Sequence, residues 1–397
     1  MTAHSFLGSP QVRDLPGDHC PFLPVFGPPA VMFVRGEGTQ LWDVNGKRYL
    51  DFLSGIAVTS LGHAHPGVAR ALADQAHTML HVSNFFANPV AARAAVMIDE
   101  LLGGGGQVFF CNSGAEANEA AIKLARKFGG RSRHRVVSML GSFHGRTLAA
   151  LAATGQPAKH EPFQPMPEGF SHVPYGDLGA LERAVDGTVA AVLLECVQGE
   201  GGVLVADDDY LRGVRQLCTE RGALLIVDEV QTGFARTGSW FAFEHSGIAP
   251  DAVTLAKAMG NGVPVGALWA RRDVGSVFVP GDHGSTYSGT ALATAAVIAV
   301  IEAMREIDAP RRAREMGATL AGELRRIPQV VDVRGRGLLL AVELGASRDA
   351  KAIVGELLER GLVANAVTAS AIRLAPPLTV SRGEIDEAVA MIAGVLQ

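Results

Sequence analysis

The sequence predicts an α/β fold in which a mostly parallel sheet is covered by helices on both faces. Three observations support this class. Short apolar runs alternate with helical stretches along the middle of the chain. The runs at 190–195 and 223–227 are apolar at nearly every position, as in strands that are buried on both faces of a sheet. Hydrophobic residues make up 48% of the 397 residues, enough to fill a large core.

The expected elements start with a hairpin near the N-terminus. Residues 31–35 and 40–43 have strand character and flank a turn at Gly36 and Gly38. A helix is expected over 89–102, followed by four glycines that stop it. The alternation that follows gives strand 108–111, helix 115–128, strand 135–139, helix 145–153, strand 190–195, helix 207–221, strand 223–227 and strand 252–255.

Near residue 290 the pattern changes to two long helices, which meet at Pro310 and end near residue 326. The remaining expected elements are strands at 338–343, 362–364 and 371–375, with helices at 350–360 and from 381 onward. They describe a smaller α+β unit, which we expect the N-terminal hairpin to join. The expected division is residues 1–55 as the joining segment, 56–290 as the large domain and 291–397 as the small domain.

Charge and cysteine usage narrow the class of protein. The net charge is −5 and no basic block occurs, which argues against a nucleic-acid partner. The four cysteines show no CxxC spacing, so we expect free thiols in a reducing cytoplasm and no metal site. They are Cys20, Cys111, Cys196 and Cys218.

No targeting or membrane segment is expected. The first twenty residues carry Asp14 and Asp18 and lack the apolar core of a signal peptide. The most apolar helical run, 293–304, contains Glu302 and is too short to cross a bilayer. We therefore expect a cytoplasmic enzyme-sized protein without membrane contact.

Candidate binding residues stand where the strand at 108–111 should end. Ser113, Gly114 and Ala115 are small and precede the expected helix, in which Glu116 stands three residues after Ser113. Ser113 and Glu116 fit a capping box, which needs no ligand. The same arrangement also lets an anionic group approach the free N–H groups of a helix N-terminus. From these residues alone, both interpretations stay open.

Two charged residues follow neighbouring apolar runs. Asp228 follows the run 223–227, and Lys257 follows the run 252–256. A carboxylate at the end of a buried strand is costly unless a partner neutralises it, although an aspartate there often just caps a turn. A lysine at a strand end most often just reaches solvent. The functional interpretation is that Asp228 pairs with a cationic heteroaromatic nitrogen and that Lys257 is placed for its amine.

One cofactor matches the helix start, the aspartate and the lysine together. Pyridoxal phosphate has a phosphate, a pyridine nitrogen that a carboxylate can pair with, and an aldehyde that forms a Schiff base with lysine. Phe143 offers an aromatic face for the ring, although it also suits a simple core position. No GxGxxG or GxxxxGK sequence occurs, which disfavours a nicotinamide oxidoreductase or a P-loop NTPase.

Several motifs, in the right order, resemble those of the class III (ω-amino acid) aminotransferases, which are pyridoxal-phosphate-dependent enzymes of fold type I. The resemblance covers about residues 24–397, and the first and last motifs match the acetylornithine aminotransferase branch most closely. The motifs are GEGTQLWDVNGKRYLDFLSGIAVTSLGHAHP, NSGAEANEAAIKLAR, SFHGRTLAA, VDEVQTGFARTG, TLAKAMGNGVP, HGSTYSG and NAVTASAIRLAPPLTV.

The resemblance implies a role for each matching residue. Lys257 would be the catalytic lysine. The other cofactor-binding residues would be Ser113, Gly114 and Ala115 at the phosphate, Phe143 on the ring face, Asp228 at the ring nitrogen and Gln231 near the ring hydroxyl. Thr286 would reach the phosphate in the neighbouring subunit, which implies a homodimer with shared active sites. Arg146 would bind a substrate carboxylate.

Glu200 and Arg373 would form a pair with a physical purpose. The amine donor has no carboxylate beside its reacting carbon, whereas the acceptor 2-oxoglutarate has one there. A buried arginine left unpaired costs roughly 3–5 kcal/mol. Glu200 would neutralise Arg373 for the donor and release it for the acceptor. A structural surface ion pair, worth far less, is the simpler alternative.

The implied reaction moves the terminal amine of N2-acetyl-L-ornithine to 2-oxoglutarate and gives N-acetylglutamate 5-semialdehyde and glutamate. Ile56 stands where the ornithine δ-aminotransferases have a tyrosine, which argues against free ornithine. The chain departs from the branch at Cys196, where a proline is usual, at 288–292 (SGTAL) and after Lys257 (AMGNG).

Other activities stay open at this point. One is transfer from another ω-amine donor, such as ornithine, 4-aminobutyrate or 2,4-diaminobutyrate. Another is an aminomutase or decarboxylase of the same fold, which would not depend on 2-oxoglutarate. A non-catalytic module that binds pyridoxal phosphate is disfavoured, because it has no use for a carboxylate switch.

Overall fold

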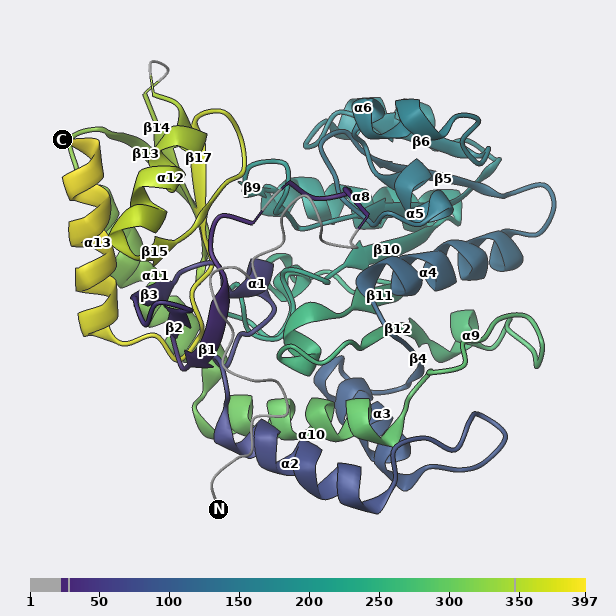
Figure 1. The fold of residues 1–397 in the computed structure, drawn as a ribbon. Helices are drawn as coiled ribbons and strands as arrows, with labels where there is room; N and C mark the ends of the chain where they lie inside the picture. The colour runs from purple at the N-terminus through teal and green to yellow at the C-terminus, as the bar shows by residue number, and fades with distance from the viewer. Residues whose placement is uncertain (1–22, 28, 346–347) are drawn as a thin grey trace.

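A seven-stranded sheet forms the centre of the larger part of the molecule (Figure 1). The computed structural model describes residues 23–27, 29–345 and 348–397, so Cys20 and the segment expected to lack a signal lie outside the described residues. In spatial order the strands are Gly106–Cys111 (β4), Gly266–Arg271 (β12), Ala252–Leu255 (β11), Leu224–Asp228 (β10), Val189–Leu194 (β7), Arg135–Met139 (β5) and Phe170–Val173 (β6). Only β12 runs antiparallel to its neighbours, so the predicted fold class is confirmed.

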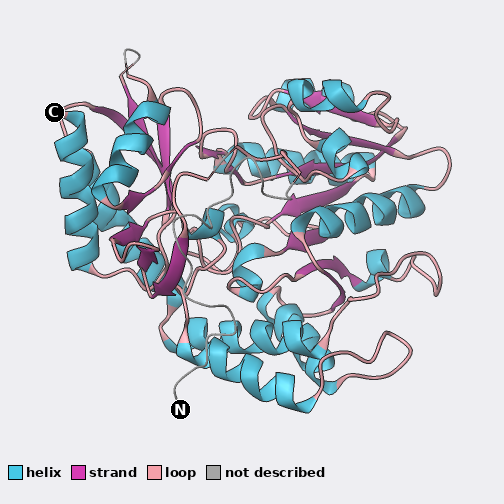
Figure 2. Cartoon of the chain, in the orientation of Figure 1, coloured by secondary structure: helices cyan, strands magenta, loops and turns pink. Residues whose placement is uncertain are grey.

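Strand β10 shows why the strands of the central sheet are apolar at nearly every position. Leu224 and Ile226 belong to one buried cluster, and Leu225 and Val227 belong to another. Successive side chains of a strand point to opposite faces, so both faces of this sheet are covered. The helix Gly114–Gly129 (α4) packs on the first face and Asp208–Arg221 (α8) on the second, as the layers in Figure 2 show.

The two ends of the chain meet in a separate sheet. Its strands are Phe33–Glu37 (β1), Gln40–Asp43 (β2), Arg48–Asp51 (β3) and Leu362–Val363 (β15), and β3 pairs with β15 in parallel. A second sheet contains Val330–Arg336 (β13), Leu339–Leu344 (β14), Ala371–Leu374 (β17) and Asn365–Ala366 (β16). The expected hairpin therefore joins C-terminal elements. The domain boundaries at residues 55 and 290 stay a prediction.

The helix Ala291–Glu306 (α10) connects these parts. It packs against Pro66–Thr78 (α2), Pro89–Leu101 (α3) and the 3₁₀ turn Lys257–Gly260 (η4). Figure 1 shows α2, α3 and α10 lying together below the central sheet. Because α10 packs against η4, it supports the turn that carries Lys257.

Shorter and C-terminal elements complete the fold. Three helices pack on or near the C-terminal sheets, namely Ala309–Leu324 (α11), Ala350–Arg360 (α12) and Arg382–Leu396 (α13). The others are Ser54–Ala57 (α1), Leu148–Ala153 (α5), Pro157–His160 (α6), Glu161–Phe163 (η2), Leu178–Ala184 (α7), Val197–Gln198 (β8), Leu204–Val205 (β9), Ala242–Ser246 (η3) and Arg272–Gly275 (α9). Within the described ranges, no helix has the length and apolar character needed to cross a membrane.

The expected helix at 145–153 is three residues too long at its start, because α5 begins at Leu148. Its first turn is fixed by the side chain of Glu119, whose Oε1 accepts hydrogen bonds from the amides of Ala149 and Ala150 at 3.0 and 3.1 Å. The carboxylate thus satisfies amides that have no helical partner. Residues 141–147 stay outside the helix.

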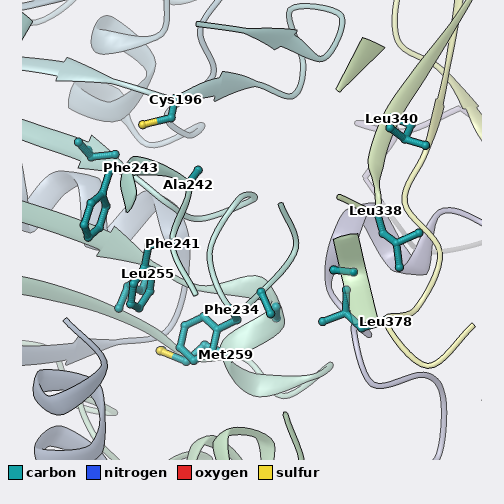
Figure 3. Packing of buried hydrophobic residues seen from close by; sticks show 14 of the residues in the cluster. Cys196, Phe234, Phe241, Ala242, Phe243, Leu255, Met259, Leu338, Leu340 and Leu378 are labelled. Atoms are coloured by element: carbon teal, nitrogen blue, oxygen red, sulfur yellow. The ribbon is translucent and has the colours of Figure 1, made fainter. Parts of the chain in front are cut away.

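An aromatic cluster packs between the end of the sheet and the Lys257 turn (Figure 3). The rings of Phe241 and Phe243 are stacked with centroids 5.7 Å apart, and Phe234 meets Phe241 edge-on at 6.0 Å. Leu255 and Met259, on either side of Lys257 in sequence, belong to the same buried cluster. This packing anchors the backbone on both sides of the lysine.

We predict opposite effects for two glycines of α11. A β-carbon at Gly317 would lie 2.0 Å from the carbonyl oxygen of Gly337, whereas one at Gly322 would meet nothing within 4 Å. Gly317→Ala should therefore lower the free energy of unfolding by about 1–3 kcal/mol. Gly322→Ala should raise it by about 0.5–1 kcal/mol, because glycine is a poor helix former. Thermal and urea unfolding would measure both changes, and equal effects would contradict this packing.

Candidate active site

A cavity of about 380 Å³ opens at the carboxyl ends of the parallel strands. This is the edge of an open α/β sheet where ligands usually bind. Its lining includes nine of the predicted site residues, namely Ser113, Gly114, Ala115, Phe143, Arg146, Glu200, Asp228, Gln231 and Lys257. Segments far apart in the sequence thus contribute to one site.

Asp228 is held by two side chains that the sequence did not single out. Its Oδ2 accepts a hydrogen bond from Asn118 Nδ2 at 2.8 Å and lies 2.8 Å from Nδ1 of His144. The carboxylate is only 3% exposed. Asn118 also donates to the carbonyl of His144 and accepts from the hydroxyl of Thr254. The network fixes one oxygen of a buried carboxylate from two sides.

Lys257 follows β11 and begins the η4 turn, where its φ of 47° lies in the left-handed region. Such a conformation costs a non-glycine residue of order 1 kcal/mol and is most common at functional sites. Burial lowers the pKa of the Lys257 amine, and the charge of Arg373 lowers it further, while Glu200, Asp228 and Glu195 oppose the shift. A lower pKa leaves more of the amine neutral, as nucleophilic chemistry requires.

The start of α4 offers an anion site at the cavity. Ser113 Oγ accepts from the amide of Glu116 at 3.2 Å, as expected for a cap. The reciprocal half of the predicted capping box is wrong, because Glu116 Oε2 accepts instead from the amide and side chain of Asn112, each at 2.8 Å. The amides of Gly114 and Ala115 are in the first turn, where N–H groups have no intrahelical acceptor.

Phe143 lies on the cavity wall between a buried carboxyl and two cations. Its amide donates to Glu195 Oε2 at 3.1 Å. Arg146 Cζ and Lys159 Nζ lie 5.7 and 5.5 Å from the centre of its ring. Burial raises the pKa of Glu195 to about 7, with His144 opposing the shift and Asp228 adding to it.

Glu200 and Arg373 form the predicted ion pair inside the cavity region. Arg373 Nη1 lies 2.5 Å from Glu200 Oε1, and the arginine is completely buried. Arg373 also donates to Asn365 Oδ1 at 3.0 Å and to Gln231 Oε1 at 3.1 Å. Burial alone would raise the pKa of Glu200, but Arg373, Lys257 and Lys159 hold that pKa below its usual value. A surface pair with a merely structural role does not match this burial.

Two predicted residues do not line the cavity that the described residues form: Arg373 lies behind Glu200 and Gln231, which do line it, and Thr286 has no such contact with the lining. Thr286 is exposed, and the lining residues do not include it. Its neighbour Ser285 accepts hydrogen bonds from Asn84 through its carbonyl and from Asn112 through its hydroxyl, at 2.9 and 3.0 Å. These contacts hold the segment at the surface, close to the start of α4.

Four residues near the site were missed, namely Asn118, His144, Lys159 and Glu195. Asn118 interrupts the buried alanine-rich face of α4, and a polar side chain in such a stripe is a usable signal. His144 stands beside Phe143 in the sequence and is 2% exposed. Glu195 directly follows β7, much as Asp228 ends β10, so the reasoning used for Asp228 applies to it as well.

Comparison with known proteins agrees with this geometry. The family model described as aminotransferase class-III matches residues 26–396. The acetylornithine aminotransferase of Gloeobacter violaceus is 48% identical over 375 residues, 92% of this chain and 93% of the relative. That of Methanothermobacter thermautotrophicus is 45% identical over 370 residues, 92% of this chain and 94% of the relative.

The chain belongs to the class-III aminotransferase family. Solved structures of similar fold include the ornithine aminotransferase of Toxoplasma gondii, with a TM-score of 0.90, 36% identity, and 94% of this chain and 91% of that chain covered. An (S)-enantioselective ω-transaminase from Thermomicrobium roseum has a TM-score of 0.88 and 34% identity, with 93% and 92% covered. The chain is a pyridoxal-phosphate-dependent transaminase of fold type I, as its motifs predicted.

The residues present fit pyridoxal phosphate. The cavity contains free first-turn amides of α4 for a phosphate, a buried carboxylate for a pyridine nitrogen and a lysine amine for an aldehyde. Phe143 provides an aromatic wall. A β-carbon at Gly114 would lie 2.7 Å from Val230 Cγ1, which explains the glycine at the helix start.

Glu229 should make stability depend on pH. This side chain is 1% exposed and accepts from the amide of Phe243 at 3.0 Å and from the hydroxyl of Thr232. Burial raises its pKa from 4.5 to about 7. Between these values the unfolded chain has lost a proton that the folded chain keeps, so the contribution to stability is complete below pH 4.5 and falls as pH rises towards 7.

Glu229→Gln removes this titration, so we expect the wild type to lose on the order of 1–3 kcal/mol relative to the variant between pH 5 and 8. Urea unfolding of the two holoenzymes across this range is the measurement. Glu220→Gln, at an exposed position of α8, serves as the control. Parallel curves for the wild type and Glu229→Gln would show that Glu229 is ionised in the folded protein at all these pH values.

Proposed function

We propose that this enzyme transfers the terminal amine of N2-acetyl-L-ornithine to 2-oxoglutarate, giving N-acetylglutamate 5-semialdehyde and glutamate. The observation that carries the proposal is the ion pair of Glu200 with the buried Arg373, because Glu200 lines the same cavity as Lys257 and Arg146. Arg373 can bind the carboxylate beside the oxo group of 2-oxoglutarate. The amine donor has no carboxylate at that position, so Glu200 must neutralise Arg373 when the donor binds. The names of the relatives, acetylornithine aminotransferase in both cases, support this donor.

Pyridoxal phosphate supplies an electron sink for the carbanion formed at the reacting carbon of the substrate. Asp228, whose Oδ2 is held by Asn118 and His144, would pair with the ring nitrogen. Phe143 would support the ring face, Gln231 would stand near the ring hydroxyl, and the start of α4 would hold the phosphate. Lys257 would hold the cofactor through its aldehyde, and the same amine would move the proton at the reacting carbon of the substrate as general base and acid.

Recognition of the two substrates depends on which carboxylates they carry. Arg146 binds the carboxylate at the remote end of each substrate. With the donor, Glu200 stays on Arg373, so no unpaired charge faces the amine-bearing carbon. With 2-oxoglutarate, the carboxylate beside the oxo group replaces Glu200 on Arg373.

Ile56 supports acetylornithine over free ornithine as the donor. Its side chain is 37% exposed and offers no hydrogen bond. The departure at Cys196 does not bear on the donor, because this side chain packs in the aromatic cluster of Figure 3 and does not line the cavity. Other ω-amines therefore remain the second candidate class, distinguished by the donor experiment below.

The functional unit in this proposal is a homodimer in the cytoplasm. Thr286 lies outside the cavity of its own chain, which agrees with its reaching a neighbouring subunit. Close to it in sequence or space are large exposed side chains, Phe85 at 92%, Phe86 at 71% and Tyr287 at 62% exposed. A patch of such side chains suits a subunit interface.

The three described cysteines are buried free thiols, as in a reducing compartment.

A panel of amine donors tests the function. Single-turnover spectroscopy of the holoenzyme should show a rapid change in the visible absorbance of the cofactor with N2-acetylornithine, reversed by 2-oxoglutarate. Ornithine, 4-aminobutyrate and 2,4-diaminobutyrate should react at least about tenfold more slowly. Lys257→Ala should retain the fold and lose turnover. A fast reaction with another donor alone would reassign the substrate, and full turnover by Lys257→Ala would refute the chemistry.

Glu200→Ala should separate the two half-reactions. Without its partner, buried Arg373 faces the amine donor unpaired, and we expect kcat/KM for the donor to fall about 100-fold, or about 3 kcal/mol. The effect on 2-oxoglutarate should stay below about fivefold, because this substrate supplies its own carboxylate. Glu343→Ala, which breaks the ion pair between Glu343 of β14 and Arg334 of β13, is the control. Equal losses with both substrates would contradict the switch.

A further inference from the structure

A second cation lies beside the loop that carries Phe143, and the proposed reaction does not yet give it a role. Lys159 lies on α6, and its ammonium is 5.5 Å from the centre of the Phe143 ring. Arg146 approaches the same ring at 5.7 Å. Phe143 and Arg146 both line the cavity, so Lys159 stands at the edge of the substrate site.

Hydrogen bonds of neighbouring residues hold the ammonium of Lys159 in its position. Gln156 Nε2 donates to the carbonyl of Ser142 at 2.9 Å, next to Phe143, and Gln156 Oε1 accepts from the ammonium of Lys159. His160 is tied to the carbonyl of Thr154 at 2.7 Å. These contacts hold the ammonium beside the loop although the lysine is only half-buried.

Neither cation has an acidic partner in the part of the chain that the structure describes. Gln156 orients Lys159 but is neutral and cannot balance its charge. Burial lowers the pKa of Lys159 and the charge of Arg146 lowers it further, while Glu200 raises it. Glu200 is already paired with Arg373. Two like charges near one ring repel each other, and a bound anion would relieve this repulsion.

We propose that Lys159 is a specificity-determining residue, the second cation beside Arg146 in a subsite for the carboxylate remote from the reacting carbon. The identity of that carboxylate rests on the proposed function. In acetylornithine it is the α-carboxylate, and in 2-oxoglutarate it is the carboxylate far from the oxo group. Both half-reactions therefore use the same two cations, whereas only the acceptor uses Arg373.

The test compares a donor with and without its carboxylate. We expect Lys159→Gln to raise KM for N2-acetylornithine about tenfold with kcat changed less than about twofold, since a charge-assisted hydrogen bond is lost in binding. N-acetyl-1,4-diaminobutane, the same chain without the carboxylate, should show the same KM with both enzymes. Lys159→Arg should restore binding to within about threefold. Lys351→Gln, at an exposed position of α12, is the matched control.

A binding measurement that needs no turnover makes the result independent of the donor. Glutarate carries two carboxylates but no reacting group, and calorimetry should show its Kd for the holoenzyme to rise about tenfold with Lys159→Gln. Equal KM increases with both donors, or an unchanged Kd for glutarate, would overturn the role of Lys159. The wild type could fail to react with acetylornithine while Lys159→Gln still raises the Kd of glutarate. That result would refute the proposed donor but support the role of Lys159 in the carboxylate subsite.

Discussion

The buried carboxylate of Asp228 is the interaction on which the arrangement of the site depends. A carboxyl group at 3% exposure needs fixed hydrogen-bond partners in place of water. Those partners, Asn118 and His144, come from α4 and from the loop after β5, and Thr254 of β11 orients the asparagine. One carboxyl group therefore holds three segments at the end of β10 in fixed positions.

The same elements place the other functional groups. Because α4 brings Asn118 to Asp228, the start of this helix faces the cavity one turn earlier, at Gly114 and Ala115. The loop that brings His144 also presents Phe143 and Arg146. The two segments that contact Asp228 therefore also provide the groups for the phosphate, the ring and the substrate carboxylate.

Most of this arrangement could be predicted from the sequence, namely the parts for which a local pattern of residues has one common structural explanation. Continuous apolar runs predicted the parallel strands. Nine of the motif residues line one cavity, whereas Arg373 contacts it only through Glu200 and Gln231, and Thr286 lies outside it. The sequence-based prediction missed β12, whose antiparallel direction depends on strands distant in the sequence. It also extended the helix at 145–153 too far, because the carboxylate that starts α5 belongs to Glu119 on another helix. Such partners are set by tertiary contacts and leave no local pattern.

The way in which Arg373 is paired has a consequence for exchange between substrates. Glu200 touches only Nη1 of the guanidinium, and Nη2 is buried without a hydrogen-bond partner among the described residues. A planar guanidinium can hold a carboxylate through two parallel hydrogen bonds, and Glu200 uses only one of these. An incoming carboxylate that makes both bonds gains a contact that Glu200 does not make. Exchange of Glu200 for a substrate carboxylate would therefore replace a one-bond contact with a two-bond contact at Arg373.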